Sequence, residues 1–297
     1  MDLEGHIVEL TQLRYFQTAA YYQHISRAAE ELNISQPALS TMISRLEKEL
    51  GVPLFDHNGR SIILNQNGQR FLQRVNHILM EVENSKRELQ DIADEGDNSI
   101  SLAVSSSQFL QGMHAFMYQH PNYKWNQRVA ENKEIAALLN RGQIDLAVTS
   151  PGIYGEVFES TLLLRDIFKL AVHKDNPLAQ RKSVRLEELT DQRFIMLLKG
   201  LPFRTQTDRI FADLGITPHY IMECDHLLRR ELINANAGVT IASQSASFRH
   251  LFSENIRFLD IEDVYPTRDI VMVHRKGRYL NRASRQFADF LKQKFSP

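Results

Sequence analysis

The chain has 297 residues, 43% of them hydrophobic and 24% charged, and its formal net charge is −1. This composition is typical of a folded globular protein, and the length predicts two or three domains. Cys224 is the only cysteine, which excludes an internal disulfide and a cysteine-built zinc site. No apolar run approaches the roughly 20 residues that span a bilayer, and residues 1–10 do not resemble a secretory signal, so we expect a cytoplasmic protein with no membrane partner.

Residues 9–65 have the pattern of a winged helix-turn-helix domain. Apolar residues at helical spacing predict a first helix near 13–20 and a second over 26–32, whose first residue, a serine, would be its N-cap. Ser35 would cap a third helix, with Pro37 in the first turn, where a missing N–H costs nothing. Two short helices joined by roughly three or four residues form a helix-turn-helix.

A hairpin and a long helix follow. The polar turn 56–59 lies between two short apolar runs, which predicts a β-hairpin and, directly after a recognition helix, a wing. Asn65 would then cap a helix over 66–94. Its apolar residues alternate by four and three positions, as in a dimer-forming coiled coil, although one face of an ordinary amphipathic helix has the same pattern. The dimerisation residues that this spacing predicts are Phe71, Val75, Ile78, Val82 and Leu89.

Residues 95–98 are polar and contain a glycine, which predicts a hinge, and strands alternate with helices over 99–297. This alternation indicates an α/β domain with a parallel sheet and helices on both faces, and its length favours two lobes. The predicted strands are 100–104, 126–130, 144–149, 167–173, 194–198, 219–223, 239–242, 256–259 and 270–274, and the predicted helices are 108–119, 133–141, 205–214, 225–236 and 281–295.

The sequence offers no catalytic or metal-binding signature. There is no glycine-rich phosphate loop and no Gly-x-Ser-x-Gly elbow, and the histidines lack metal-ligand spacing. We therefore expect no enzyme activity, no metal and no cofactor. For Cys224, burial at a strand end is favoured over a reactive thiol.

A small-molecule site is predicted where two strands end. Ser105, Ser106 and Ser107 follow the first predicted strand of the α/β domain, and Thr149 ends the third. Ligands of open α/β sheets bind at the carboxyl ends of strands, and short hydroxyl side chains there suit a carboxylate or similar small anion. These residues could instead be helix N-caps. The predicted loop 200–204 would form a further wall through Phe203 and Arg204, with Arg204 either pairing with a carboxylate or exposed to solvent.

Several motifs resemble those of the LysR-type transcriptional regulators. The resemblance is continuous over residues 12–80 and weaker but ordered beyond. The motifs are Leu13–Phe16, Ser26–Ala29, Ile34–Ser40, Leu46–Phe55, Asn176–Ala179 and Ala235–Val239.

The resemblance implies a winged helix, a linker helix and a periplasmic-binding-protein-like effector domain. The two lobes of that domain would be residues 99–165 with 267–297, and residues 166–266. It also implies a homodimer or homotetramer that binds an interrupted palindrome of double-stranded DNA under the control of a small-molecule effector, with RNA polymerase as a further candidate partner.

Carried over by position, the residues that read bases and phosphates would be Gln36, Pro37, Ser40, Thr41, Arg45 and, on the wing, Arg60. This sequence has His57 and Thr41 where the family often has arginine, and acidic residues outnumber basic ones in the first 60 positions. We therefore expect weaker or more salt-sensitive DNA binding than is usual, with more reliance on tetramer avidity.

Two alternatives remain open from the sequence. One is a redox- or pH-responsive regulator that uses Cys224 or the histidines and has no small-molecule effector. The other is an enzyme that shares the two-lobed fold.

Overall fold

The computed structural model describes residues 8–58, 61–93, 98–245 and 252–295. It consists of two compact units, residues 1–97 with the short segment 140–142, and residues 98–139 with 143–297. Apart from Asn98, the expected hinge 95–98 lies outside the described residues. Among the described helices, none is both long and apolar enough to cross a membrane.

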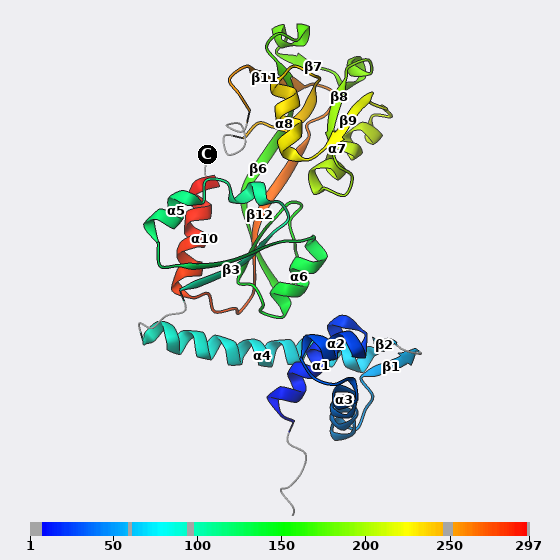
Figure 1. Cartoon of the computed structure of the whole chain (residues 1–297), viewed down its shortest axis with the longest axis vertical. Coiled ribbons are helices and arrows are strands. Elements are labelled where there is room, and N and C mark those ends of the chain that lie inside the picture. Colours follow the sequence, from blue (N-terminus) through cyan, green and yellow to red (C-terminus); the bar gives the residue numbers. More distant parts are fainter. Residues whose placement is uncertain (1–7, 59–60, 94–97, 246–251, 296–297) are drawn as a thin grey trace, which may run out of the picture. The chain divides into compact units, whose positions relative to one another are not determined.

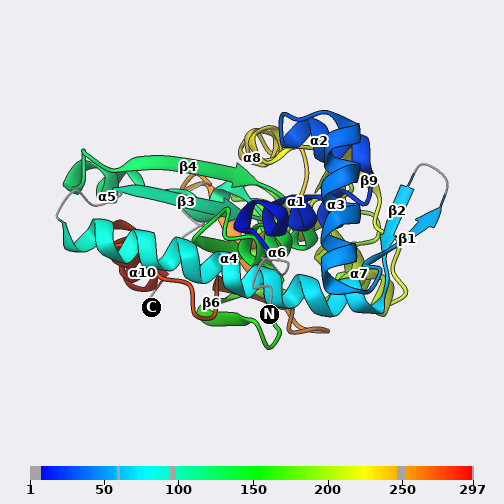
Figure 2. The same ribbon diagram turned by 90° about the horizontal axis from the view of Figure 1, so that it is seen from below.

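The described residues of the N-terminal unit form three helices, a hairpin and a long fourth helix (Figures 1 and 2). These elements are α1 (Leu10–Tyr22), α2 (Ile25–Glu31), α3 (Gln36–Leu50), β1 (Phe55–Asn58), β2 (Ser61–Leu64) and α4 (Gln66–Ile92). Two predicted caps are confirmed: Ser35 Oγ accepts a hydrogen bond from Ala38 N at 3.4 Å, and Asn65 Oδ1 accepts one from Gly68 N at 2.9 Å.

The predicted cap of α2 is wrong. The helix begins one residue earlier, at Ile25, and the Nδ1 atom of His24 accepts the capping hydrogen bond from Arg27 N at 3.5 Å. Ile25 packs against the hydrophobic core of the unit, which explains why it joins the helix. Ser26 therefore lies in the first turn, and its hydroxyl donates to Gln36 Oε1 at 3.1 Å instead.

Phe16 on α1 lies at the centre of the N-terminal core and is fully buried. Its ring centroid is 5.5 Å from that of Phe55 on β1 and 5.1 Å from that of Phe71 on α4. Val75 on α4 is also fully buried in this core. The first turns of α4 thus complete the domain, because their apolar side chains cover α1 and the hairpin.

The C-terminal unit is built on one eight-stranded sheet with two hydrophobic regions, which we call lobe one and lobe two (Figure 1). In lobe one, β3 pairs in parallel with β4 and β5, and α10 and α5 cover one face while α6 covers the other. Its elements are β3 (Ser99–Val104), the 3-10 helix η1 (Ser107–Leu110), α5 (His114–Gln119), β4 (Lys124–Val129), α6 (Asn132–Asn140), β5 (Leu146–Thr149) and α10 (Arg282–Phe295).

In lobe two, β10 and β11 pair with β6, β7 pairs with β11, and β8 and β9 form a small parallel sheet. The helices α7 and α8 pack on this lobe. Its elements are η2 (Pro177–Gln180), β7 (Ser183–Val184), η3 (Leu186–Leu189), β8 (Phe194–Leu197), α7 (Pro202–Asp213), β9 (Tyr220–Cys224), α8 (His226–Asn234), β10 (Thr240–Ser243) and β11 (Ile256–Ile261).

Two long strands, β6 (Phe158–His173) and β12 (Thr267–Arg275), connect the lobes. They pair with each other in antiparallel fashion from Phe158 to Ile167, and β12 also pairs antiparallel with β5. The expected parallel sheet is therefore confirmed for β3, β4 and β5 only. The sheet as a whole is mixed, because the two connecting strands run against their neighbours. The predicted strand 167–173 is only the second half of β6.

The predicted helix 108–119 is also wrong, since the chain forms η1 and α5 with a break between them. Gly112 lies in the break with φ of 80°, a left-handed conformation that other residues adopt only under strain. The break leaves Gln111 between the two helices, where its side chain lines the cleft described below.

Candidate functional site

The third helix presents a polar stripe to solvent. Leu39, Ile43 and Leu46 are buried in the domain core, and residues on the opposite side of α3 are exposed at intervals of four. This exposed face contains the residues Gln36, Pro37, Ser40, Thr41 and Arg45. The helix therefore has the shape and polarity needed to enter a DNA major groove.

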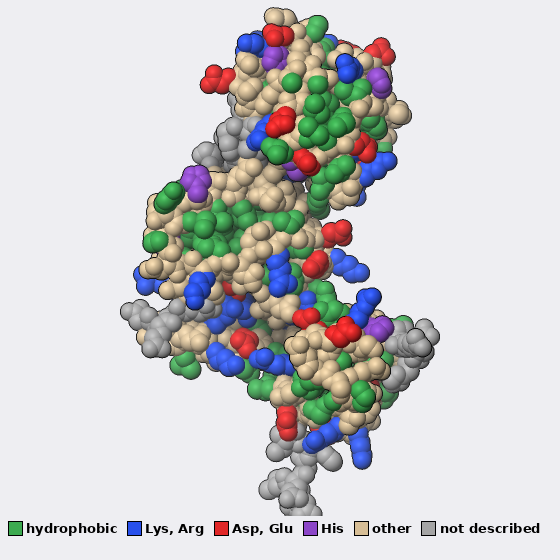
Figure 3. Space-filling model, in the orientation of Figure 1, with side chains coloured by type: hydrophobic (Ala, Val, Ile, Leu, Met, Phe, Trp, Pro, Cys, Tyr) green, Lys and Arg blue, Asp and Glu red, His purple; other side chains and the backbone are tan. Residues whose placement is uncertain are grey.

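The side chains of this stripe are partly ordered by their own contacts. The Thr41 hydroxyl donates to Pro37 O at 2.9 Å, and Arg45 Nε pairs with Glu49 Oε1 at 2.9 Å while its side chain stays 60% exposed. Arg60 of the wing lies outside the described residues, as does the side chain of His57. On the face shown in Figure 3, the N-terminal unit has Lys and Arg mixed with Asp and Glu and no broad basic patch.

The predicted dimer residues of α4 fall into two groups. Phe71 and Val75 pack in the core of their own domain, so they are not a free interface. Ile78 and Leu89 are exposed, at 43% and 67%, and Val82 is half-buried. Only the second half of the predicted stripe is therefore free to contact another molecule.

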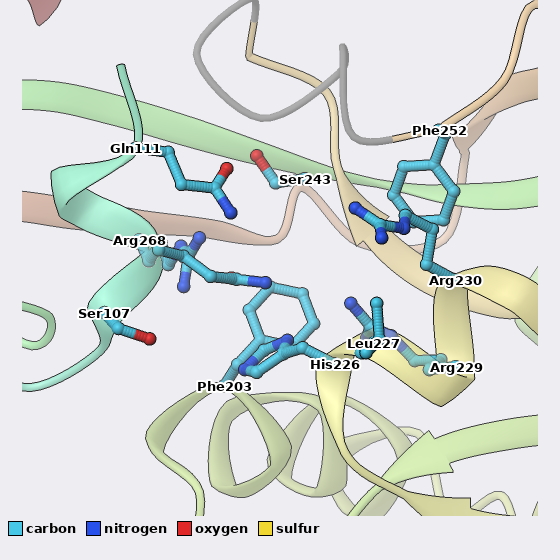
Figure 4. Close-up of a pocket in the computed structure, with 11 residues that line it drawn as sticks. Ser107, Gln111, Phe203, His226, Leu227, Arg229, Arg230, Ser243, Phe252 and Arg268 are labelled. Atoms are coloured by element: carbon cyan, nitrogen blue, oxygen red, sulfur yellow. The ribbon is translucent and has the colours of Figure 1, made fainter. Parts of the chain in front are cut away.

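A cavity of about 180 Å³ lies in the cleft between lobe one and lobe two (Figure 4). Lobe one contributes η1 and the turn after it, and lobe two contributes α7, α8 and β10, with β12 passing beside them. Its lining residues are Ser107, Gln108, Gln111, Phe203, His226, Leu227, Arg229, Arg230, Ser243, Phe252 and Arg268.

The strand-end serines line a second, adjoining cavity of about 110 Å³, which shares Ser107, Gln108, Phe203, His226 and Arg268 with the first. Ser105, Ser106 and Ser150 contribute to its wall. The two predicted strand ends do lie together: Ser105 Oγ accepts a hydrogen bond from the backbone N–H of Ser150 at 3.0 Å.

The other predicted effector residues differ in their roles. Ser106 caps η1 by accepting from Gln108 N at 3.4 Å, so the N-cap alternative applies to this serine. Thr149 is fully buried and lines neither cavity, and among the described residues its Oγ1 has no hydrogen-bond partner. Phe203 lines both cavities.

Arg204 is neither in a loop nor exposed to solvent, and the carboxylates with which it pairs belong to the protein. Residue 204 lies in the first turn of α7, and its side chain is 2% exposed. Its guanidinium donates to Asp208 at 2.6 Å, to Glu223 at 2.8 Å and to the backbone oxygen of Leu197 at 2.5 Å. These acceptors occupy it within lobe two, and it lines neither cavity, so we exclude it from the candidate site.

Two buried arginines in the cleft were not found by sequence reasoning. The guanidinium carbons of Arg229 and Arg268 lie 5.5 Å and 4.7 Å from the centroid of the same Phe203 ring. Burial lowers the pKa of both, that of Arg229 to about 10. Arg268 Nε forms an ion pair with Asp166 Oδ2 at 2.9 Å, whereas Arg229 Nη1 donates to the backbone oxygen of Ile241, at 3.3 Å.

His226, at the start of α8, lies beside these arginines. Burial, reinforced by the positive charges of Arg229 and Arg268, lowers the pKa of its imidazole to about 4. It is therefore neutral at neutral pH. The strand-end rule that indicated the serines would also have indicated His226, because α8 begins directly after β9. No such rule indicates Arg268, which reaches the cleft from the beginning of β12.

Cys224 is buried at the end of β9, as expected. Burial raises the pKa of its thiol, which disfavours the reactive thiolate. Within the described parts of the chain, no group of three or more His, Cys, Asp or Glu side chains is arranged to hold a metal ion.

Two family models match nearly the whole chain. Residues 10–69 match the model of the bacterial regulatory helix-turn-helix protein of the lysR family, and residues 94–296 match that of the LysR substrate binding domain. Among curated proteins, the chain is 31% identical to an uncharacterized HTH-type transcriptional regulator, YybE, of Bacillus subtilis (strain 168), over 97% of this chain and all of that one. It is 25% identical to the RuBisCO operon transcriptional regulator of Allochromatium vinosum, over 96% of this chain and 95% of the relative.

Solved structures share the fold over the full length. A full-length OxyR from Pseudomonas aeruginosa aligns with a TM-score of 0.61 at 21% identity, over 98% of this chain and 95% of that one. Full-length CbnR in complex with its target DNA aligns with a TM-score of 0.55 at 21% identity, over 97% of this chain and 100% of that one.

Proposed function

This chain belongs to the LysR family of bacterial transcriptional regulators, and we propose that a small anionic molecule bound between the two lobes controls how it binds DNA. The observation that carries the proposal is the pair of buried arginines, Arg229 and Arg268, in a cleft bordered by both lobes. An anion held there would contact both lobes at once. It would therefore favour one arrangement of the lobes over others.

The coupling to DNA follows from the way the lobes are joined. They are connected by β6 and β12, so a change in lobe closure is a rotation about two strands. Such a change alters DNA binding only if the ligand has different affinities for the two arrangements. We propose that closure changes how the paired DNA-binding domains are spaced on an interrupted palindrome.

The proposed division of the chain follows the same scheme. Residues 9–65 would bind DNA through Gln36, Pro37, Ser40, Thr41 and Arg45 on α3 and Arg60 on the wing. Residues 66–94 would pair with a second copy through Ile78, Val82 and Leu89, and 95–98 would be the hinge to the effector domain, 99–297. We further propose that the protein is a homotetramer and acts in the cytoplasm, where bacterial DNA lies. RNA polymerase is a further proposed partner, and we propose no catalytic activity.

The redox alternative has little support in this chain. Cys224 is buried, its thiol pKa is raised, and no second cysteine exists to form an internal disulfide. The pH alternative would need a group that titrates near neutrality, and the pKa of the cleft histidine, His226, is about 4.

The experiment is a thermal-shift screen of metabolites against the full-length protein, followed by DNase I footprinting on the DNA upstream of its own gene. A ligand raises the midpoint temperature by mass action. We expect at least one stabilising compound to change the length or the spacing of the footprint, and this change to be lost in Arg229→Gln. Stabilising compounds that leave the footprint unchanged would overturn the proposed control mechanism.

A further inference from the structure

We propose that the ligand of the interlobe cleft is a compact dianion, such as a short dicarboxylate or a phosphate monoester, recognised by Arg229, Arg230 and Arg268. This inference rests on the proposed function, in that it names the chemical class of the effector.

The number of negative charges on the ligand is inferred from the ion pairs around the cavity. Among the described residues that line it, three are arginines and none is an aspartate or glutamate. Arg268 is balanced by Asp166, whose other carboxylate oxygen accepts a hydrogen bond from the Ser243 hydroxyl at 2.5 Å. Among the described residues, neither Arg229 nor Arg230 forms an ion pair. Two positive charges are thus left without a counter-charge, and a ligand with two negative charges would neutralise them.

Of the three arginines, Arg229 has the greatest need of an anionic partner. Its side chain is almost fully buried, and its Nε has no hydrogen-bond partner among the described residues. A buried charge without a partner is costly, and a charge-assisted hydrogen bond to a carboxylate or phosphate oxygen removes that cost. The neighbouring charge of Arg268 adds repulsion that an anion between them would relieve.

The N-terminus of α8 does not supply the anion site by itself. Asp225 caps it, with Oδ1 accepting from the backbone N–H groups of Leu227 at 2.8 Å and Leu228 at 2.9 Å. The cap already uses these donors. Recognition would therefore come from the arginine side chains, which offer a planar, directed set of N–H donors.

The remaining polar groups suit a polar ligand rather than an apolar one. His226 Nδ1 and Gln111 Oε1 are buried, and neither has a hydrogen-bond partner among the described residues. Both side chains border the same space as the arginines (Figure 4). The cavity, at about 180 Å³, is smaller than the roughly 300 Å³ at the lower end of sites for drug-sized ligands, so the ligand is compact.

The test is isothermal titration calorimetry of the full-length protein at pH 7.5 and constant ionic strength. The probes form two matched pairs: succinate against butyrate, and methyl phosphate against dimethyl phosphate. Inorganic sulfate is a fifth probe. We expect the dianion of at least one pair, and sulfate, to bind roughly tenfold or more tightly than the monoanions, the effect of one charged hydrogen bond. The two pairs distinguish a dicarboxylate from a phosphate ester.

Variants of the cleft arginines test whether the dianion binds in the cleft. Arg229→Gln and Arg230→Gln should each weaken dianion binding by roughly tenfold and leave the monoanion affinity nearly unchanged. Arg209→Gln, an exposed arginine on α7, is the matched control and should change neither. Circular dichroism of each variant confirms that it is folded.

Two results overturn the inference. One is that none of the dianions binds more tightly to the wild type than to Arg229→Gln. The other is that a neutral or singly charged compound is the tightest ligand of the cleft. If such a compound also changes the DNA footprint, the proposed function stands and the dianion inference fails. If a dianion binds in the cleft and the footprint does not change, the proposed function fails and the dianion inference stands.

Discussion

Asp166 on β6 and Arg268 on β12 form a buried cross-strand ion pair where the two strands pass between the lobes. The Oδ2 to Nε distance is 2.9 Å, and the side chains are 0% and 6% exposed. The next cross-strand pair, Arg165 with Asp269, also forms an ion pair at 2.9 Å, but its side chains are 63% and 32% exposed. The chain thus contains a buried and an exposed version of one interaction, side by side at the point where the lobes connect.

The buried pair should matter much more for stability than the exposed one. Asp166→Asn leaves the charge of Arg268 buried without its counter-charge, and we expect the free energy of unfolding in urea to fall by about 3–5 kcal/mol. Asp269→Asn is the control and should cost far less, because solvent screens the exposed pair. Equal losses in the two variants would show that burial of the first pair does not set its strength.

His226 should make the protein less stable in mild acid. Its pKa in the folded chain is about 4, against 6.5 as its ordinary value, because burial and the charges of Arg229 and Arg268 outweigh the opposing effect of Asp225. A depressed pKa means that the unfolded chain binds the proton more readily. The free energy of unfolding is therefore unaffected by this histidine above about pH 6.5. It falls by up to about 3 kcal/mol as the pH falls toward 4, because the unfolded chain takes up the proton first.

This effect is measured as the difference between unfolding curves recorded from pH 7.5 to 4. The wild type should lose more stability over that interval than His226→Gln, which has no titrating group at the site. His219→Gln removes an exposed histidine and should behave like the wild type. Parallel curves for the wild type and His226→Gln would mean that this histidine is not held neutral by its surroundings.

The dimer interface should depend on the second half of α4. Leu89→Asp places a charge on an exposed apolar position, and we expect the sedimentation coefficient at micromolar concentration to fall from that of the proposed tetramer to that of a smaller oligomer, because the pairing through α4 is lost. Val75→Ala should instead lower the stability of the fold by roughly 0.5–3 kcal/mol without dissociating the oligomer, because Val75 packs in its own domain. Gln90→Asp, also exposed on α4, is the control for the added charge.

Adding an arginine to the recognition helix should strengthen DNA binding. Thr41→Arg adds a positive charge on the exposed face of α3, and each added phosphate contact makes the slope of log K against log salt more negative by about 1. By the same rule, the absence of this arginine predicts weaker binding of the wild type and not a steeper salt dependence. Thr205→Arg is a matched control, because its hydroxyl also donates four residues back along a helix, to Leu201 O. A steeper slope in both variants would indicate a general charge effect unrelated to α3.

The thiol of Cys224 should react slowly in the native protein. Its pKa is raised by burial, so the thiolate is scarce at pH 7.5. We expect alkylation by iodoacetamide to be much slower in the folded chain than in urea, and Cys224→Ser to leave effector-dependent DNA binding intact. Loss of effector-dependent DNA binding in Cys224→Ser would support the alternative of a redox-responsive regulator.

The sequence by itself determined the local elements of the N-terminal domain and the family. Ser35 with Pro37, and Asn65, mark helix starts because their side-chain oxygens or ring geometry satisfy the first turn wherever the helix later packs. It also located the serines after β3 and the end of β5, because a strand end is a local feature. The hydrogen bond from the backbone N–H of Ser150 to Ser105 Oγ agrees with that placement.

Only the tertiary structure decided which charged residues face the cleft. Arg204 looks available in the sequence, yet it is paired with Asp208 and Glu223 inside lobe two. Arg229 and Arg268 give no local signal, since one lies within a helix and the other begins a strand. They meet at the same Phe203 ring only because β12 brings a residue that is distant in the chain next to α7 and α8. Pairing and burial depend on such long-range packing, and no local pattern encodes them.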